Sequence, residues 1–272
     1  MQITDKTFVL TGAGNGIGRE VALELLRRGG RVAALDISAD GLNQTVELAA
    51  GENPQARERI SVHPVDITDR AAVAALPAAI AEHHPAVDGV INVAGIVHRF
   101  ASVDELEFSE IERVMGVNFW GTVNVVKTFL PGLRQRAEAS LVNVSSMGAL
   151  APVPGQSAYG ASKAAVKLLT DGLAAELRGS TVAVTVVFPG GVGTNILGNS
   201  GVDMKVSADA DSAKGMVMTT PSSAGRQIVD AVVKGTPRLR IGSDAKSLDR
   251  LSRLMPVKVV GIIADKMKSL LD

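Results

Sequence analysis

The chain has no cysteine and few aromatic residues, and both absences limit what it can be. Its 272 residues include one tyrosine and one tryptophan, and aromatic residues make up only 3%. The lack of cysteine excludes disulfides and thiolate metal sites and favours a reducing compartment, so we expect a cytoplasmic protein without a metal site. Because 46% of the residues are hydrophobic, the core must be aliphatic, which suits a buried parallel sheet covered by helices.

The chain also lacks net charge and long apolar runs. Basic and acidic residues number 28 each, so no global field attracts nucleic acid, and a small neutral or anionic ligand is favoured. No apolar run approaches the roughly 18 residues of a membrane-spanning helix. Residues 1–10 lack the positive stretch and long apolar segment of a secretory signal.

Short β-type runs alternate with longer segments of helical periodicity. Strands are predicted at residues 7–10, 31–35, 60–65, 87–93, 140–144 and 181–188, and helices at residues 16–28, 69–83, 110–136 and 157–178. This alternation is typical of an α/β protein with a doubly wound parallel sheet in three α/β/α layers, and the length fits a single domain. Ligands of such sheets bind beyond the carboxyl ends of the strands, where the strand order reverses.

Two segments near the C-terminus depart from this alternation. We assign residues 1–242 to the α/β domain, with a substrate lid at about 195–220, where small and polar residues interrupt any period. Residues 243–272 are predicted to form a basic amphipathic helical tail that Pro256 should break. The tail either packs on its own or a neighbouring subunit, makes peripheral contact with an anionic membrane, or covers the mouth of a substrate pocket.

A glycine-rich run, residues 11–18, follows the first predicted strand and opens a helix. Glycine permits a tight turn and lets the backbone approach a pyrophosphate, whose charge meets the amides and dipole of the helix N-terminus. The alternative is a tight turn that binds nothing. We interpret the run as part of a dinucleotide site that includes Gly12, Asn15, Gly16, Ile17 and Gly18.

Asp36 ends the second predicted strand, 18 residues beyond Gly18. An acidic side chain at that place can accept hydrogen bonds from both ribose hydroxyls of an adenosine and would repel a 2′-phosphate. NAD is therefore favoured over NADP. Arg19 lies nearby and keeps NADP as the alternative.

Two later strand ends carry residues suited to the same ligand. Asp66 and Ile67 follow the third predicted strand, and Asn92, Ala94 and Gly95 follow the fourth. Asp66 either meets the adenine or serves as a turn or helix-capping residue. Asn92 either contacts the cofactor or braces neighbouring strands.

Tyr159 and Lys163 stand four residues apart on a predicted helix, which places a phenol beside an ammonium. A phenol has a pKa near ~10, and at an effective dielectric of ~20 a cation ~4 Å away favours the phenolate by ~4 kcal/mol. The pair predicts a tyrosine that acts as an acid or base near neutrality. In isolation such a pair is more often two surface neighbours.

Together these motifs resemble those of the short-chain dehydrogenase/reductase superfamily, in its soluble single-domain branch. The resemblance covers most of residues 4–240 and rests on the order and spacing of the glycine run, Asp66, Asn118 and residues 92–95, 143–146, 159–163 and 189–194. Val93 departs from it, since many members carry a second asparagine there. The resemblance implies a Rossmann-like fold and a catalytic group formed by Asn118, Ser146, Tyr159 and Lys163.

The resemblance also implies a role for each member of this group. Tyr159 would take the proton of an alcohol while hydride leaves for the nicotinamide, and would return it in reverse. Ser146 would hydrogen-bond the substrate oxygen, Lys163 would lower the pKa of Tyr159 and bind the nicotinamide ribose, and Asn118 would anchor a water that links Lys163 to solvent. Tyr159 and Lys163 thus count among the cofactor contacts as well.

Ser146 is preferred to Ser145 for two reasons. Ser146 lies 13 residues before Tyr159, the usual separation in the family. Adjacent residues of a strand also point to opposite faces, so both serines cannot aim at one substrate. Ser145 is instead expected to be a strand-end serine that bonds the backbone.

The loop after the sixth predicted strand contacts the nicotinamide carboxamide in relatives. By resemblance we predict cofactor contacts from Pro189, Gly190, Val192 and Thr194, with a plain turn as the alternative. His98 and Arg99 lie among the predicted pocket residues and either bind a polar group of the substrate or are simply solvated.

We therefore predict an NAD-dependent oxidoreductase that transfers hydride between a hydrophobic secondary alcohol or ketone and nicotinamide. The alternatives are an NADP-dependent ketone reductase of the same family and a non-catalytic NAD(P) sensor, which would be expected to have lost part of the catalytic group. Relatives assemble as dimers or tetramers through the helices that hold Asn118 and Tyr159, so a homo-oligomer is expected, for example a homotetramer.

Overall fold

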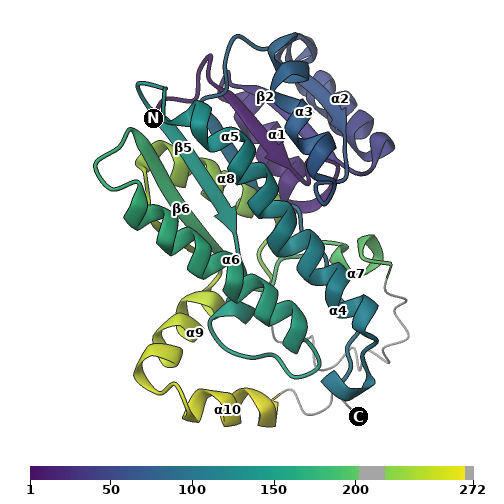
Figure 1. Cartoon of the computed structure of the whole chain (residues 1–272), viewed down its shortest axis with the longest axis vertical. Coiled ribbons are helices and arrows are strands. Elements are labelled where there is room, and N and C mark those ends of the chain that lie inside the picture. Colours follow the sequence, from purple (N-terminus) through teal and green to yellow (C-terminus); the bar gives the residue numbers. More distant parts are fainter. Residues whose placement is uncertain (202–217, 267–272) are drawn as a thin grey trace.

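Seven parallel strands form one sheet within the part of the chain that the computed structural model describes, residues 1–201 and 218–266 (Figure 1). The strands are β1 (Thr7–Thr11), β2 (Arg31–Asp36), β3 (Ile60–Pro64), β4 (Gly89–Asn92), β5 (Ala139–Val144), β6 (Val182–Pro189) and β7 (Arg238–Ile241). Their order is β3-β2-β1-β4-β5-β6-β7, so the strand order reverses between β1 and β4. Most of the predicted lid, residues 202–217, and the end of the predicted tail, residues 267–272, lie outside the described residues.

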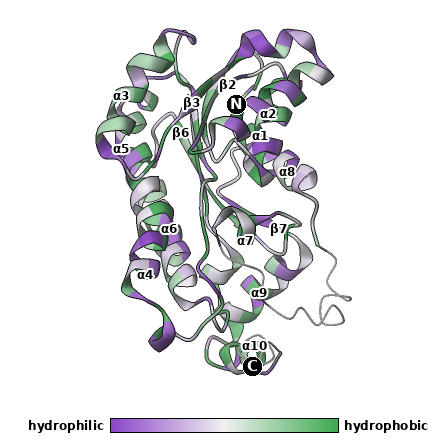
Figure 2. Cartoon of the chain, turned by 90° about the vertical axis from the view of Figure 1, so that its right-hand side faces the viewer, coloured by the Kyte–Doolittle hydropathy of each residue, from purple (hydrophilic) through white to green (hydrophobic). Residues whose placement is uncertain are grey.

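Helices cover both faces of the sheet and give three layers (Figure 2). They are α1 (Gly16–Arg27), α2 (Ala39–Glu52), α3 (Arg70–Ala81), α4 (Phe108–Met115), α5 (Thr122–Leu133), α6 (Ser157–Glu176), α7 (Ile196–Asn199), α8 (Pro221–Lys234), α9 (Ser243–Leu254) and α10 (Lys258–Lys266). Helices α1, α2 and α8 contribute to the core on one face, and α3, α5 and α6 to the core on the other. The predicted doubly wound α/β fold is confirmed.

The core is mostly aliphatic, as the composition predicts, with a few phenylalanines. Along β1, Phe8 and Leu10 belong to the core beside α1 and Val9 to the core beside α5, and all three are fully buried. This alternation is that of a strand buried on both sides. Burial of each such side chain stabilises the fold by roughly 1.5–3 kcal/mol. The sheet therefore holds the loops at its carboxyl edge in fixed positions.

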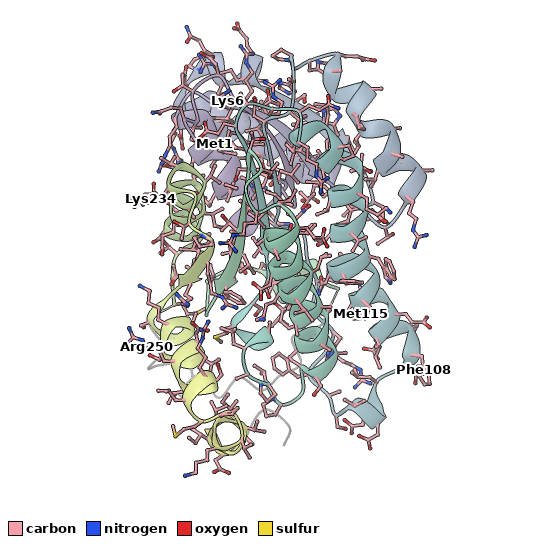
Figure 3. All side chains as sticks on the ribbon, turned by 60° about the vertical axis from the view of Figure 1, so that its left-hand side comes forward. Met1, Lys6, Phe108, Met115, Lys234 and Arg250 are labelled. Carbon is pink, nitrogen blue, oxygen red and sulfur yellow. The ribbon has the colours of Figure 1, made fainter. Side chains whose placement is uncertain are left out.

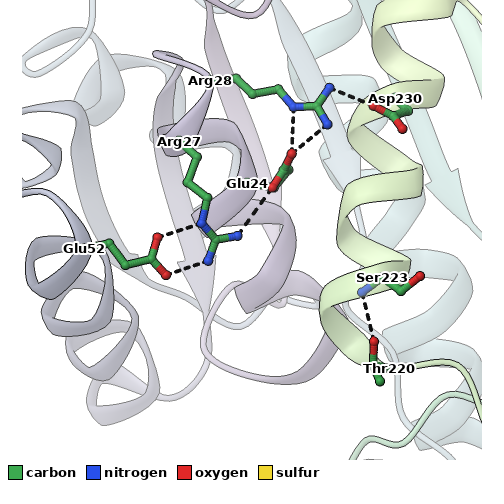
Figure 4. Close-up of polar contacts among 7 residues, drawn as sticks. All are labelled: Glu24, Arg27, Arg28, Glu52, Thr220, Ser223 and Asp230. Carbon is green, nitrogen blue, oxygen red and sulfur yellow. Dashed lines mark hydrogen bonds and ion pairs between the residues drawn. The ribbon is translucent and has the colours of Figure 1, made fainter.

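Ion pairs join α1 to the helices on either side of it (Figure 4). Arg27 Nη2 lies 2.6 Å from Glu52 Oε1 in α2, and Arg28 Nη1 lies 2.8 Å from Asp230 Oδ1 in α8. Glu24 accepts hydrogen bonds from both arginines. Partly exposed pairs of this kind contribute up to about 1 kcal/mol each, so they mainly orient the helices.

The helix predicted at residues 110–136 is interrupted. A π-helical segment, Gly116–Gly121, separates α4 from α5 and contains Asn118. Such segments occur often at functional sites. The apolar period of the sequence passes through this segment almost unchanged, which is why the pattern predicts one continuous helix.

The C-terminal part contains a strand that the sequence pattern misses and a helix break that it predicts. β7 has only four residues, two of them arginine, and forms the sheet edge beside β6. Helix α9 ends at Leu254 and α10 begins at Lys258, so the helices break around Pro256 as predicted. Across residues 1–201 and 218–266, every helix is too short or too polar to cross a membrane.

Candidate active site

The glycine-rich turn after β1 lies directly against the end of β4. Gly12 and Gly16 have positive φ angles of 72° and 52°, a region that favours glycine. A Cβ atom added to Gly12 would lie 2.9 Å from the backbone nitrogen of Ala94, and one added to Gly18 would lie 2.0 Å from the Gly12 carbonyl oxygen. The turn therefore requires glycine for both its conformation and its close packing.

Asp36 reaches the same turn from the end of β2. Its carboxylate accepts hydrogen bonds from the backbone amides of Gly14 at 2.9 Å and Ser38 at 3.0 Å. A carboxylate offers about four lone-pair sites, so two backbone bonds leave capacity for ribose hydroxyls. The position beside the turn is the one that the sequence predicts.

Arg19 points into the contact between α1 and α2. Its guanidinium donates to Thr45 Oγ1 at 3.1 Å, to Gln44 Oε1 at 3.1 Å and to the Gly14 carbonyl oxygen. These bonds occupy much of its donor capacity. The nearest basic candidate for a 2′-phosphate is thus already engaged by protein oxygens.

The end of β4 is held by its two neighbouring strands. Thr11 Oγ1 accepts from the amides of Val93 and Ala94, each at 3.1 Å. Asn92 Nδ2 donates to Asn143 Oδ1 at 2.9 Å, so Asn92 braces β4 against β5. Its own Oδ1 is buried and has no hydrogen-bond partner among residues 1–201 and 218–266. The structure thus shows the bracing alternative, and a cofactor contact of Asn92 stays a prediction.

Asp66 forms a turn, and Asp69 provides the cap of α3. Asp66 Oδ1 accepts from both the amide and the hydroxyl of Thr68 at 2.8 Å, while Asp69 accepts from the first amides of α3. Ile67 is buried, and its carbonyl oxygen accepts from Asn124 at 3.0 Å. Asp66 itself is exposed at the sheet edge, and its contact with adenine stays a prediction.

The two adjacent serines after β5 point in different directions, as the strand geometry predicts. Ser145 is buried, and its hydroxyl donates to the Lys163 carbonyl oxygen at 2.7 Å. The half-buried Ser146 points toward the ring of Tyr159, because a Cβ atom on Gly148 would lie 3.5 Å from Ser146 Oγ and 3.8 Å from Tyr159 Cε1. The structure brings Ser146, and not Ser145, to the phenol.

The pKa of Tyr159 moves opposite to the prediction. The four-residue spacing predicts that Lys163 lowers it, but burial raises the pKa of Tyr159, and the hydrogen bond with Ser146 opposes that rise. Lys163 Nζ donates instead to the Val144 carbonyl oxygen at 3.1 Å. Burial lowers the pKa of Lys163 to about 8. Both changes have one cause, because a dry environment disfavours whichever form is charged.

Asn118 is completely buried and fixed by its side chain. Its Oδ1 accepts from the Ile96 amide at 2.8 Å, and its Nδ2 donates to the Ile96 carbonyl at 2.9 Å and to Ser162 Oγ at 2.9 Å. A Cβ atom on Gly95 would lie 2.8 Å from Lys163 Nζ and 3.1 Å from Asn118 Oδ1. Asn118 and Lys163 therefore border the same point.

The loop after β6 faces the glycine turn. A Cβ atom on Gly16 would lie 3.4 Å from Cγ2 of Thr194. The Gly190 amide donates to the Ile241 carbonyl oxygen at 2.9 Å, and Val192 pairs with Thr219 in an isolated β-bridge. Pro189 ends β6 and is buried.

His98 and Arg99 differ from each other in their surroundings. His98 is 1% exposed, so the solvated alternative is wrong for it; its Nδ1 bonds the Arg99 carbonyl oxygen at 2.6 Å. Gln156, also buried, donates to the His98 carbonyl oxygen at 2.8 Å. Arg99 is exposed and pairs with Glu110 at 3.2 Å. A histidine followed by an arginine gives no sequence signal that separates the buried residue from the exposed one.

Ser162 is a contributor that sequence reasoning missed. Its hydroxyl joins Asn118 in the π-helical segment to the Tyr159 carbonyl oxygen, at 2.9 Å and 2.7 Å. Its place three residues after Tyr159 was a usable signal, since residues three apart lie on the same side of a helix.

These contacts form a continuous strip along the carboxyl edge of the sheet. Asp36 accepts a hydrogen bond from the glycine turn. The turn packs against Ala94 and Thr194, and Gly95 packs against Lys163. Positive-φ glycines, close backbone approach and a helix N-terminus at one point fit a dinucleotide. The described residues contain no group of three or more side chains suited to a metal ion.

The chain belongs to the short-chain dehydrogenase/reductase family. The family model described as short chain dehydrogenase matches residues 6–205. The protein is therefore an oxidoreductase with the NAD(P)-dependent dehydrogenase/reductase activity of this family.

Relatives and solved structures agree with this assignment. “Putative oxidoreductase SadH” of Mycobacterium tuberculosis is 39% identical over 256 residues, 92% of this chain and 91% of the relative. Levodione reductase of Leifsonia aquatica is 27% identical over 81% of this chain and 82% of the relative. A Burkholderia phymatum short-chain dehydrogenase/reductase in complex with NAD shares the fold, with a TM-score of 0.83, 24% identity and coverage of 93% and 95%. A Burkholderia cenocepacia short-chain dehydrogenase in complex with NADP shares it as well, with a TM-score of 0.79, 24% identity and coverage of 97% and 99%.

Proposed function

We propose that the protein is an NAD-dependent dehydrogenase or reductase that interconverts a hydrophobic secondary alcohol and its ketone. The observation that carries this proposal is that Ser146 and Tyr159 border one point, since a Cβ atom on Gly148 would lie 3.5 Å from Ser146 Oγ and 3.8 Å from Tyr159 Cε1. The buried Lys163 stands on the same helix as Tyr159. Ser146 and Tyr159 lie at the same sheet edge as the glycine turn. An acid–base group is thus next to the site that suits a dinucleotide.

Each catalytic side chain has a role that its surroundings support. Tyr159 takes the hydroxyl proton of the alcohol, or gives a proton to the ketone. Ser146 donates a hydrogen bond to the substrate oxygen and stabilises the charge that develops there. Lys163, buried with its Nζ bonded to the Val144 carbonyl oxygen, would bind the nicotinamide ribose, and Asn118 helps to pass the proton onward. Bound NAD supplies the hydride acceptor.

The order of the strands supports an orientation for the cofactor. Asp36 stands on β2, on one side of the glycine turn, and would bind the adenosine ribose. Lys163 and the loop of Val192 and Thr194 stand on the β5–β6 side. The nicotinamide half would therefore contact Val192 and Thr194, with the pyrophosphate at the turn between the two halves.

Asp36 and Arg19 together favour NAD over NADP. The carboxylate would repel a 2′-phosphate, and the Arg19 guanidinium is already held by Thr45 and Gln44. Both cofactors occur in solved structures of similar fold, one from Burkholderia phymatum with NAD and one from Burkholderia cenocepacia with NADP, so the choice depends on these side chains.

A spectrophotometric screen tests the proposal. Secondary alcohols and ketones of increasing apolar size are offered with each cofactor while nicotinamide absorbance is recorded. We expect kcat/KM to favour NAD by roughly tenfold or more, equivalent to ~1.4 kcal/mol, and Asp36→Ala to remove that preference. Asp40→Asn, on the exposed first turn of α2, is the matched control and should keep it. Activity with neither cofactor on any substrate would refute the proposed function.

We further propose a cytoplasmic homo-oligomer that assembles through the helices around Asn118 and Tyr159. Large apolar side chains are exposed on these helices: Phe108 at the outer end of α4 (Figure 3) is 83% exposed, Trp120 is 48% exposed, and Leu168 of α6 is 69% exposed. Contact between subunits would bury them. Sedimentation equilibrium should show a dimer or tetramer, and Leu168→Arg should shift it toward monomer.

The assignment of residues 243–272 to a separate tail, and its contact with membranes, remain proposals. Helix α9 packs on the sheet edge, where Asp249 pairs with Arg240, which supports ordinary packing for this helix. Helix α10 exposes Val260 at 45% and Ile262 at 40%, next to lysines. Cosedimentation with anionic liposomes, with and without residues 244–272, tests membrane contact.

A further inference from the structure

A carboxylate at the start of helix α9 is hydrogen-bonded to the loop after β6. In Figure 1, α9 lies beyond the end toward which the strands β5 and β6 point. Asp244, in its first turn, accepts a hydrogen bond from the Gly191 amide at 2.6 Å through Oδ2 and one from the Ala245 amide at 2.8 Å through Oδ1. One carboxylate thus joins the C-terminal segment to a loop 53 residues away.

The packing around this carboxylate leaves no space for larger neighbours. A Cβ atom on Gly190 would lie 2.1 Å from Asp244 Oδ1, and one on Gly242, whose φ is +96°, would lie 2.3 Å from it. The Asp244 carboxylate occupies the position that side chains at both glycines would take. The contact is therefore a close fit between three backbone segments.

The same loop is held from its other side by backbone bonds. The Thr219 amide donates to the Gly191 carbonyl oxygen at 2.9 Å, and the Gly193 amide donates to the Thr219 carbonyl oxygen at 3.1 Å. Both polar backbone groups of Gly191 are thus engaged, the amide by Asp244. Thr194 follows three residues after Gly191 and faces the glycine turn.

We propose that Asp244 is a positioning residue that holds the loop at residues 190–194 in the conformation needed to bind the nicotinamide half of the cofactor. This inference rests on the proposed function. A hydrogen bond from an amide to a carboxylate is stronger than one between neutral groups, and without it the loop must be ordered when the cofactor binds. Asp244 itself would not touch the cofactor.

Two ligands separate positioning from general structural support. NADH contains the nicotinamide, whereas ADP-ribose has the adenosine, the pyrophosphate and a ribose without it. Calorimetric titration of the full chain should show NADH binding to Asp244→Ala weakened roughly 10- to 100-fold, with ADP-ribose binding unchanged. Asp244→Asn keeps an acceptor oxygen and should restore most of the NADH affinity.

Asp249→Asn is the control for loosening of α9 as a whole. Asp249 binds Arg240 and Arg253, whereas the Gly191 amide of the loop is bound by Asp244, so substitution of Asp249 should leave both affinities unchanged. The inference is overturned if Asp244→Ala and Asp244→Asn bind NADH as the wild type does, if ADP-ribose binding weakens equally, or if Asp249→Asn gives the same loss. Failure of the wild type to bind either NADH or NADPH would instead refute the proposed function, and this inference with it.

Discussion

Replacing Lys163 with methionine should stabilise the fold while it removes activity. Lys163 is 3% exposed, and burial lowers its pKa from 10.5 to about 8. At ~1.4 kcal/mol for each pH unit, holding the charged form costs the folded state roughly 3 kcal/mol near pH 7. Methionine has a similar length and no charge, but it gives up the hydrogen bond to Val144, worth about 1 kcal/mol. The net gain is therefore about 2 kcal/mol.

Thermal unfolding of wild type and Lys163→Met at equal protein concentration measures this gain. A domain of this size gains ~2–4 °C for each kcal/mol, so Tm should rise by roughly 4–8 °C at pH 7. Lys163 is deprotonated in the folded state above about pH 8 but in the unfolded state only above 10.5. The wild type therefore gains stability as pH rises through this window, and the advantage of the variant should shrink across it.

Lys167→Met is the matched control, since Lys167 stands one helical turn further on, is partly exposed and pairs with Asp171 at 2.9 Å. It should not raise Tm. The reasoning is refuted if Lys163→Met has the Tm of the wild type or a lower one at pH 7, or if its advantage stays constant between pH 8 and 10.5.

Three further predictions concern single side chains. Gly18→Ala should lower Tm by several degrees, because its Cβ would lie 2.0 Å from the Gly12 carbonyl oxygen, whereas Gly172→Ala, with nothing within 4 Å, should leave Tm unchanged or raise it. Ser145→Ala should lower the free energy of unfolding by about 1 kcal/mol, since it loses the hydrogen bond to the Lys163 carbonyl oxygen. Ser146→Ala should instead lower kcat with little change in Tm. Equal effects of the two variants on kcat would contradict the assignment of Ser146 as the catalytic serine. Burial and the neighbouring His63 and His83 lower the pKa of His84 from 6.5 to about 4, so stability should fall as pH drops through this window, by up to roughly 3 kcal/mol. His84→Gln should flatten that dependence in urea unfolding, and an unchanged pH dependence would contradict the reasoning.

Features that depend on local geometry could be predicted from the sequence. Strand alternation places Ser145 and Ser146 on opposite faces, and the structure agrees, since Ser145 bonds the Lys163 carbonyl oxygen and Ser146 lies toward Tyr159. The glycine turn and Asp36 lie together as predicted, because both follow adjacent parallel strands. The fold could be predicted as well, because the alternation of strands and helices is a local pattern in the sequence.

Features that depend on direction and burial could not be predicted. The spacing of Tyr159 and Lys163 is correct, but it does not reveal that Lys163 Nζ turns to Val144 or that burial raises the pKa of Tyr159. The bond between Gly191 and Asp244 spans 53 residues and has no pattern in the sequence. The π-helical segment around Asn118 likewise leaves the apolar period unbroken.

The most direct test of the account is the turnover of Tyr159→Phe on a substrate that the wild type converts. Phenylalanine keeps the ring and removes only the hydroxyl that exchanges the proton. We predict a loss of ~10²- to 10⁴-fold in kcat, with NADH affinity and Tm close to those of the wild type. Full turnover by Tyr159→Phe would contradict the central claim that this tyrosine is the acid–base group.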